Sequence, residues 1–516
     1  MFDLSGDEVS LLSLRNIILN DTKISVGIEA SEKVRSSYSF LEKFAQDKLI
    51  YGINTGLGPM TQYRINDSDL NSLQYNLIRS HSAGCGNPID SSCVKAAMIA
   101  RLSSLSKGFS GIHIEALELL TELINKNIIP FIPEHGGVGA SGDLVQLAHL
   151  ALVMIGEGEV FYQGERKSTS EVFKTFGLKP IKMHIREGLS LINGTSVMTG
   201  IGIVNLIYAK NILNWMIIAS SMLGEIVASY DDYFSDELNR VKHHKGQRDV
   251  ASAISSILKG SALIKKRSEH LYEKKIVDEI LEEKVQEYYS IRCVPQILGP
   301  VLDTIRYAES IVLGEFESVS DNPIVDVENL NVFHGGNFHG DYVSLEMDKL
   351  KIAIAKLSLL SERHINYLMN SNLNKKIPPF ANLGTLGLNL GMQGVQFTAV
   401  STAAENQTLS YPMYLHTIPN NNDNQDIVSM GTNSALIAKK VIDNSYEVLS
   451  IEFIALIQSI EYLKNKDKLS PFNKMIYSEL RKVVPVFIED TPKYKSIEAM
   501  KSYLLRVFPE AGEVVL

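Results

Sequence analysis

Cysteine is scarce in this chain of 516 residues, and that scarcity excludes two kinds of protein. The three cysteines, Cys85, Cys93 and Cys293, are too few for a disulfide framework, and their spacing matches no metal-binding motif. The N-terminus lacks a basic-then-apolar signal, and the apolar run at residues 212–218 is too short to span a bilayer. We therefore expect a soluble cytoplasmic protein.

The chain also lacks an excess of positive charge. Its 50 Lys and Arg residues stand against 59 Asp and Glu residues, giving a net charge of -9, which argues against a broad nucleic-acid surface. Low-complexity tracts, internal repeats and flexible linkers are missing as well. Hydrophobic residues at 45% and charged residues at 21% are ordinary for a globular protein of this size.

Hydrophobic periodicity predicts a mainly α fold in two parts. Residues 1–205 mix short helices with glycine-containing loops, and one small strand pair is expected around residues 159–167. From about residue 197 the pattern is helical, with a long helix predicted over residues 343–369 and another long helix or helix pair over residues 428–462. Helices of this length favour a bundle and an oligomer. The predicted domains are residues 1–205 and 206–516.

The most informative segment is the glycine-rich stretch at residues 136–143. Within it, Ala140-Ser141-Gly142 can build an electrophile from the backbone. The Gly142 nitrogen attacks the Ala140 carbonyl carbon, loss of water closes a ring, and loss of the Ser141 hydroxyl leaves a methylene. The product is 4-methylidene-imidazol-5-one. Glycine permits the close approach, and a protein that needs an electrophile must borrow a cofactor or build one because side chains rarely supply it.

Other interpretations of these glycines lack their context. A dinucleotide-binding loop should follow a strand, but Pro130 and Pro133 stand there. A nucleophile elbow would need glycine in place of Asp143, and a phosphate loop would need lysine there. An ordinary glycine loop, with Asp143 capping the following helix, remains compatible with the ring chemistry.

Several further segments are rich in glycine and polar residues. Each alone is typical of a turn. Tyr289 and Arg292 are three residues apart, so on a helix they share a face. The other segments are a loop at 51–58 that we expect to be flexible, Asn193-Gly194-Thr195, Asn322-Pro323, residues 335–339 and residues 419–426.

Together, and in this order, these segments resemble the aromatic amino-acid ammonia-lyases, the family of histidine, phenylalanine and tyrosine ammonia-lyases. The resemblance runs from Ile50 to beyond Met430 and is greatest to bacterial tyrosine ammonia-lyases. It implies a mainly α, aspartase-like long-helix bundle with a loop-rich N-terminal part. It also implies a homotetramer whose active sites draw on three subunits, with helix N-termini directed at the electrophile. No metal, dissociable cofactor, nucleic acid or membrane is expected.

The resemblance assigns a role to each matching residue. Ala140-Ser141-Gly142 would form the ring, Tyr51 would remove the substrate β-proton, and Arg292 would bind the substrate carboxylate. Asn193 and Tyr289 would polarise the ring and assist the amine step. The positions expected around ring and substrate are Ser80, His81, Gln286, Asn322, Asn337, Phe338, Asn421, Asn424 and Gln425. One departure is Gln146, where the family usually has proline.

Two positions bear on the substrate and point in different directions. Ser80-His81 resembles histidine ammonia-lyases, whereas Gln425 replaces their glutamate and resembles the phenylalanine and tyrosine enzymes. A phenol reconciles both, because His81 can hydrogen-bond the hydroxyl and Gln425 suits an uncharged ring. We expect conversion of L-tyrosine to trans-p-coumarate and ammonia. The alternatives are a histidine (urocanate-forming) or phenylalanine ammonia-lyase, a 2,3-aminomutase, and an inactive helical scaffold.

The expected reaction leaves one step open. In one account the substrate amine adds to the methylidene carbon and becomes a better leaving group while Tyr51 takes the β-proton. In the other, the aromatic ring of the substrate becomes attached instead. The sequence is compatible with both.

Overall fold

The chain forms two compact units in the computed structural model, which describes residues 1–46, 48–273, 279–281 and 284–509. The first unit comprises Met1–Ile207, Ala308–Asp348 and Pro412–Lys439, and the second comprises Tyr208–Tyr307, Lys349–Tyr411 and Lys440–Leu516. The first unit thus includes Ala308–Asp348 and Pro412–Lys439, which both belong to the second predicted domain, residues 206–516. The division at residue 205 stays a prediction.

Short helices make up most of the first unit. Among them, α3, α6 and α8 pack against one another, and α4 packs against α1, α2 and α5. Their bounds are α1 Leu11–Leu19, α2 Ile28–Phe44, α3 Leu70–His81, α4 Ser91–Ser106, α5 Ile114–Asn125, α6 Leu144–Met154, α7 Thr169–Phe176 and α8 Glu187–Ile192.

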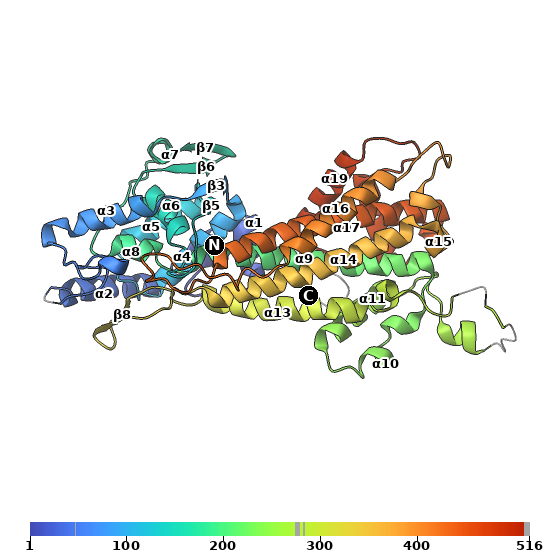
Figure 1. Cartoon of the computed structure of the whole chain (residues 1–516), viewed down its shortest axis with the longest axis horizontal. Coiled ribbons are helices and arrows are strands. Elements are labelled where there is room, and N and C mark those ends of the chain that lie inside the picture. Colours follow the sequence, from blue (N-terminus) through green and yellow to red (C-terminus); the bar gives the residue numbers. More distant parts are fainter. Residues whose placement is uncertain (47, 274–278, 282–283, 510–516) are drawn as a thin grey trace. The chain divides into compact units, whose positions relative to one another are not determined.

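The strands of the first unit are short. The predicted pair at 159–167 is confirmed: β6 (Glu159–Tyr162) and β7 (Glu165–Ser168) are antiparallel, and α7 packs on them (Figure 1). β4 (Ile129–Pro130) adds to the edge of this sheet, and β5 (Pro133–His135) pairs with β3 (Cys85–Pro88). Pro130 and Pro133 therefore lie on edge strands, where a missing N–H is tolerated. The remaining pairs are β1 (Phe2–Asp3) with β2 (Ile24–Ser25), and β8 (Ile324–Asp326) with β9 (Asn331–Phe333).

The long helices confirm the mainly α prediction. α14 (Asp341–Met369) and α17 (Gly431–Leu463) match the predicted helices closely, because both have a continuous apolar face and no internal proline. Two further long helices are α9 (Ser196–Val227) and α13 (Val294–Phe316). The second unit also contains α10 Asp236–Asn239, α11 Lys245–Leu258, α12 Tyr289–Arg292, α15 Ser371–Asn374, α16 Gln393–Leu409, α18 Pro471–Val483 and α19 Tyr494–Arg506.

Helix α9 is longer than the apolar run at 212–218 predicts. It has 32 residues, and among the described helices it alone is long and apolar enough to cross a membrane, judged by length and composition. However, 83% of its most apolar stretch is buried inside the protein. The core helix of a soluble protein has the same properties.

An apolar cluster fixes the loop that carries Tyr51. Ile50 and Ile53, on either side of it, are 3% and 1% exposed. They pack with Leu41 of α2 and with Val325 and Val332 of β8 and β9. Burying each isoleucine contributes roughly 1.5–3 kcal/mol. These apolar contacts anchor this end of residues 51–58, and the flexibility of the loop stays a prediction.

Candidate active site

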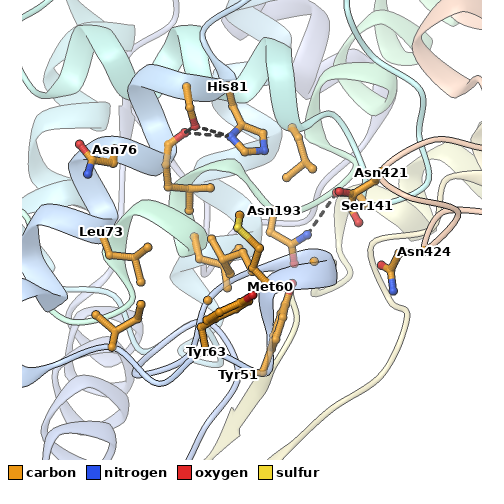
Figure 2. A pocket seen from close by; sticks show the side chains of 18 of the residues that line it. Tyr51, Met60, Tyr63, Leu73, Asn76, His81, Ser141, Asn193, Asn421 and Asn424 are labelled. Atoms are coloured by element: carbon orange, nitrogen blue, oxygen red, sulfur yellow. Dashed lines mark hydrogen bonds between the residues drawn. The ribbon is translucent and has the colours of Figure 1, made fainter.

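A cavity of about 380 Å³ in the first unit collects many of the predicted residues (Figure 2). That volume suits a small organic ligand. One wall is the face of α3 formed by Leu73, Asn76, Leu77, Ser80 and His81, which recur at helical spacing. The predicted residues that line the cavity are Tyr51, Ser80, His81, Ser141, Asn193, Asn421, Asn424 and Gln425.

The backbone at Gly142 is sharply bent against residue 194. Gly142 has φ +71°, and a Cβ built there would lie 2.1 Å from the carbonyl oxygen of Gly194. The two residues form a parallel bridge, and the next amide, Asp143 N, donates to Gly194 O at 2.8 Å. Only glycine fits this conformation and this contact.

Both ends of the Asn193 side-chain amide form hydrogen bonds beside the tripeptide. Its Nδ2 donates to the Ser141 carbonyl oxygen at 3.1 Å, as Figure 2 shows. Its Oδ1 accepts from the backbone N–H of Asn322 at 2.9 Å. Arg101 donates to the Asn193 carbonyl at 2.9 Å and pairs with Asp321 at 2.9 Å, both side chains being fully buried. Asn193 is thus held in one orientation, with its donor on Ser141.

Asp143 differs from its predicted role. It occupies the N-cap position of α6, but its carboxylate makes no hydrogen bond to that helix. Instead Oδ2 accepts from the N–H groups of Val197 and Met198, at 2.8 and 2.9 Å, in the first turn of α9. Burial raises the pKa of Asp143 to about 6, although the bonds from Thr432, Met198 and Val197 oppose the rise. The expected capping of α6 is therefore wrong, because the free N–H groups of α9 lie closer to the carboxylate.

Tyr51 and Tyr63 both line the cavity (Figure 2). Burial raises the pKa of Tyr51 above its ordinary value, and a hydrogen bond with the backbone of Gly58 offsets part of the rise. A tyrosine that acts as a base works through its phenolate. The rise therefore disfavours the basic form of Tyr51, so any activation of Tyr51 must come from other groups near the reacting substrate.

His81 is at the last turn of α3. Its Nδ1 lies 3.0 Å from the carbonyl oxygen of Leu77 and 3.0 Å from the hydroxyl oxygen of Ser80. Because a carbonyl only accepts, Nδ1 carries the proton, and in the neutral ring Nε2 is an acceptor. Burial lowers the pKa of His81, which favours that neutral ring. His81 therefore presents an acceptor nitrogen.

The segment at residues 420–425 closes the opposite side of the cavity. An isolated bridge joins Asn420 and Gln425, and Asn421 has φ +56° within this turn. Gln425 Nε2 donates to the hydroxyl oxygen of Ser141 at 3.0 Å. Gln425 therefore contacts the ring-forming tripeptide directly.

Gln286, Tyr289 and Arg292 belong to the second unit. The predicted shared face of Tyr289 and Arg292 is confirmed, because both lie on the four-residue helix α12 and the guanidinium lies 4.7 Å from the Tyr289 ring centroid. Arg292 also donates to Gln286 Oε1 at 2.6 Å. None of the three lines the cavity of the first unit.

The remaining predicted residues lie behind or beside the cavity. Asn322 supports Asn193, and its Oδ1 accepts from Gly335 N at 2.8 Å. Asn337 is exposed and Phe338 half-buried, and neither lines the cavity. His339, which the sequence analysis did not single out, has its Nδ1 3.3 Å from the Ala140 carbonyl oxygen. Its position at the end of the glycine-rich loop 335–339 is the sequence feature that could have identified it as a site residue.

One group of side chains among the described residues could hold a metal ion, and it lies outside the cavity. His113, Glu115 and His184 place ligand atoms within 4.8 Å of one another. However, His113 Nδ1 accepts from Glu115 N at 3.4 Å as the N-cap of α5, and its ring packs on His184 with centroids 4.5 Å apart. These contacts explain why the three side chains lie close together. That catalysis needs no metal stays a prediction.

Comparison with known proteins identifies the family. Residues 9–482 match the family model described as aromatic amino acid lyase. The chain is 38% identical to histidine ammonia-lyase from Caldanaerobacter subterraneus subsp. tengcongensis, over 96% of this chain and 95% of that protein. It is 35% identical to tyrosine 2,3-aminomutase from Chondromyces crocatus, over 97% and 96%.

The fold agrees with this result. A crystal structure of tyrosine aminomutase from Streptomyces globisporus superposes with a TM-score of 0.93 at 34% identity, covering 98% of this chain and 97% of that chain. The protein belongs to the aromatic amino acid lyase family and has its mainly α, aspartase-like fold. It is an enzyme of the ammonia-lyase and aminomutase group.

Proposed function

We propose that this enzyme converts L-tyrosine to trans-p-coumarate and ammonia. The observation that carries the proposal is the hydrogen bonding of His81. Because Nδ1 donates to Leu77, Nε2 of the neutral ring can accept from a phenol hydroxyl. Phenylalanine would leave that acceptor unpaired, at a cost of about 1–3 kcal/mol. The cavity is otherwise lined largely by apolar side chains such as Leu73, Leu77 and Leu189, which suit an aromatic ring.

Gln425 supports an uncharged substrate ring. A glutamate at this position could pair with an imidazolium, but the amide of Gln425 carries no charge and donates to Ser141. The Ser141 oxygen that it contacts is the one that leaves if the tripeptide cyclises. This contact therefore belongs to the chain before ring formation, and the amide becomes available to ring or substrate afterwards.

The residues present fit a self-formed 4-methylidene-imidazol-5-one. Ala140 is 5% exposed, and Gly142 has the sharp backbone bend, with no Cβ in the way, that ring closure requires. The group would supply an electrophilic carbon. Asn193 would polarise its carbonyl through the hydrogen bond that it makes to Ser141 O. Asp143, the residue after the tripeptide, accepts from the first N–H groups of α9. The positive end of the α9 dipole therefore lies near the tripeptide.

The roles of Tyr51 and Arg292 complete the proposal. Tyr51 takes the β-proton, and Arg292 binds the carboxylate with its planar fork. Among the described residues, no lysine or arginine lines the cavity of the first unit. A carboxylate bound there needs a cation from elsewhere, which supports a homotetramer with shared sites. A cytoplasmic location stays a prediction.

Two named relatives favour other candidates. Similarity to histidine ammonia-lyases, together with Ser80-His81, favours histidine, because the N–H of a neutral imidazole can also donate to His81. Similarity to tyrosine 2,3-aminomutases favours β-tyrosine as the product. The aminomutase would use the same cavity but add ammonia back at Cβ.

An assay with three substrates tests the proposal. Purified enzyme is given tyrosine, histidine or phenylalanine, and formation of the unsaturated acid is followed by absorbance. Chromatography of the tyrosine reaction separates p-coumarate from β-tyrosine. We expect the highest kcat/KM with tyrosine, and p-coumarate as the main product. A preference for histidine, or accumulation of β-tyrosine, would replace this proposal with the corresponding alternative.

A further inference from the structure

A histidine side chain lies within hydrogen-bonding distance of the carbonyl oxygen of Ala140. His339 Nδ1 lies 3.3 Å from it, and because a carbonyl only accepts, Nδ1 is the donor. This oxygen is the atom that must leave as water when the Gly142 nitrogen closes the ring. The contact therefore joins a titratable side chain to a reacting atom of ring formation.

The other nitrogen of this imidazole faces a carboxylate. His339 Nε2 lies 3.3 Å from Asp341 Oδ1, and Asp341 is in the first turn of α14. When both ring nitrogens carry protons, one points at Asp341 and the other at the Ala140 oxygen. A carboxylate in this position can accept from Nε2 and so fixes the orientation of the ring.

Backbone contacts hold the two segments together. Gly340, the residue after His339, donates its N–H to the carbonyl of Gly139, the residue before Ala140, at 3.2 Å. The hydroxyl of Ser429 donates to the same carbonyl at 3.0 Å. The main-chain bond between Gly340 and Gly139 thus holds the backbone of His339 close to that of Ala140.

We propose that His339 is the acid that promotes formation of the ring from Ala140-Ser141-Gly142, with Asp341 as its positioning residue. The inference rests on the proposed self-formed electrophile.

As the Gly142 nitrogen bonds to the Ala140 carbon, the carbonyl π pair moves onto oxygen and takes the Nδ1 proton. The proton released from the Gly142 nitrogen restores the imidazolium. In the next step the hydroxyl takes a second proton from His339 and leaves as water. The Ser141 nitrogen forms the C=N bond and loses its proton. Loss of the Ser141 Cα–H and hydroxyl gives the second water, and no oxidant or reductant is needed.

The test measures ring formation directly, without substrate. Chains labelled in a short pulse during expression are purified at successive times, and intact mass gives the fraction that has lost two waters. His339→Leu removes the donor, while His339→Gln keeps a hydrogen-bond donor that has no transferable proton. We expect both variants to slow the mass loss by roughly 10²–10⁴-fold, the usual contribution of one positioned acid. Asp341→Asn should slow it by a smaller factor.

His334→Gln is the matched control, because His334 is an exposed histidine in the same loop. It should mature at the wild-type rate. If His339→Gln also matured at that rate, hydrogen bonding alone would suffice and the acid role would be wrong. If His339→Leu failed to fold, the glutamine variant alone would decide. A wild-type chain that never lost water would refute the proposed electrophile itself, which is a different result from a normal loss in the variants.

Discussion

The imidazole of His364 and the carboxylate of Glu452 are hydrogen-bonded at 2.7 Å, and neither side chain is exposed. His364 is on α14 and Glu452 on α17. The other ring nitrogen, Nε2, donates to the carbonyl of Ser290 in α12 at 2.6 Å. On the same face of α14, Tyr367 packs edge-on against Tyr288 with centroids 5.8 Å apart. A four-residue helix is not stable alone, so these contacts set the position of α12 and its Arg292.

We predict that His364→Leu destabilises the protein by about 3–5 kcal/mol, because it leaves the Glu452 carboxylate buried without its partner. The double variant His364→Leu/Glu452→Leu should recover most of that loss. Unfolding midpoints in urea measure both effects. The single variant should also raise KM more than it lowers kcat, since Arg292 would lose its fixed position. An unchanged midpoint and KM would mean that the pair supports neither the fold nor α12.

Ser141→Ala should abolish both the two-water mass loss and turnover, because it removes the hydroxyl that must leave. The change removes one hydrogen bond, from Gln425 to the Ser141 hydroxyl, and should leave the fold intact. Intact-mass spectrometry and the absorbance assay measure the two effects on one preparation. Turnover by a Ser141→Ala enzyme without the mass loss would show that the electrophile has another origin.

His81→Leu should shift preference from tyrosine towards phenylalanine by roughly 10- to 100-fold, since each 1.4 kcal/mol is a factor of ten. The variant leaves the tyrosine hydroxyl buried without a partner, whereas phenylalanine loses nothing. The measurement is kcat/KM for both amino acids on wild type and variant. An unchanged ratio would place His81 away from the far end of the substrate ring.

Tyr51→Phe should lower kcat by about 10²–10⁴-fold while the fold is retained. Because burial raises the pKa of Tyr51, the fraction of phenolate grows with pH over the alkaline range. Wild-type kcat/KM should therefore rise with pH there, and the rise should disappear in the variant. Tyr63→Phe, which changes a second tyrosine of the cavity, is the matched comparison. If Tyr63→Phe had the larger effect, Tyr63 would be the base.

Glu187→Gln should stabilise the protein at alkaline pH. Burial raises the pKa of Glu187 from an ordinary 4.5 to about 8, and among the described residues its Oε1 has no hydrogen-bond partner. The folded state therefore holds a proton that the unfolded chain has released, so stability falls as pH rises from about 4.5 to 8. The loss is of order 5 kcal/mol at most.

Unfolding midpoints measured from pH 5 to 9 test this prediction. The variant should match wild type at pH 5 and exceed it at pH 9. Glu118→Gln changes an exposed glutamate of α5 that is not among the charges raising the pKa of Glu187, and should leave the profile as it is in wild type. A wild-type midpoint that stayed constant across the range would contradict the prediction.

Local patterns predicted much of the fold. The short run Glu159–Tyr162 before the turn residues Gln163-Gly164, and the apolar faces of α14 and α17, specify their structure within one segment, so local patterns alone identified them. The tripeptide was also found from local chemistry. These features need no knowledge of which segments meet in space.

Features that depend on distant partners could not be predicted in this way. The carboxylate of Asp143 binds N–H groups at residues 197 and 198, and its own position in the sequence suggested only the adjacent helix. Likewise, His339 reaches an atom almost two hundred residues earlier in the chain. The anchoring of Tyr51 through Val325 and Val332 has the same origin. Nothing in the local sequence encodes such pairings.

The contacts around Ala140-Ser141-Gly142 also set an order of events during translation. The carbonyl of Val138 accepts from Met430 N at 3.0 Å, and that of Gly139 accepts from Ser429, which is 290 residues later. At 5–20 residues per second, a ribosome needs roughly 15–60 s to span that interval. Throughout it, the nascent tripeptide lacks these restraints. The proposed dehydration should therefore follow translation, and chains that terminate before residue 430 should leave the ribosome unmodified.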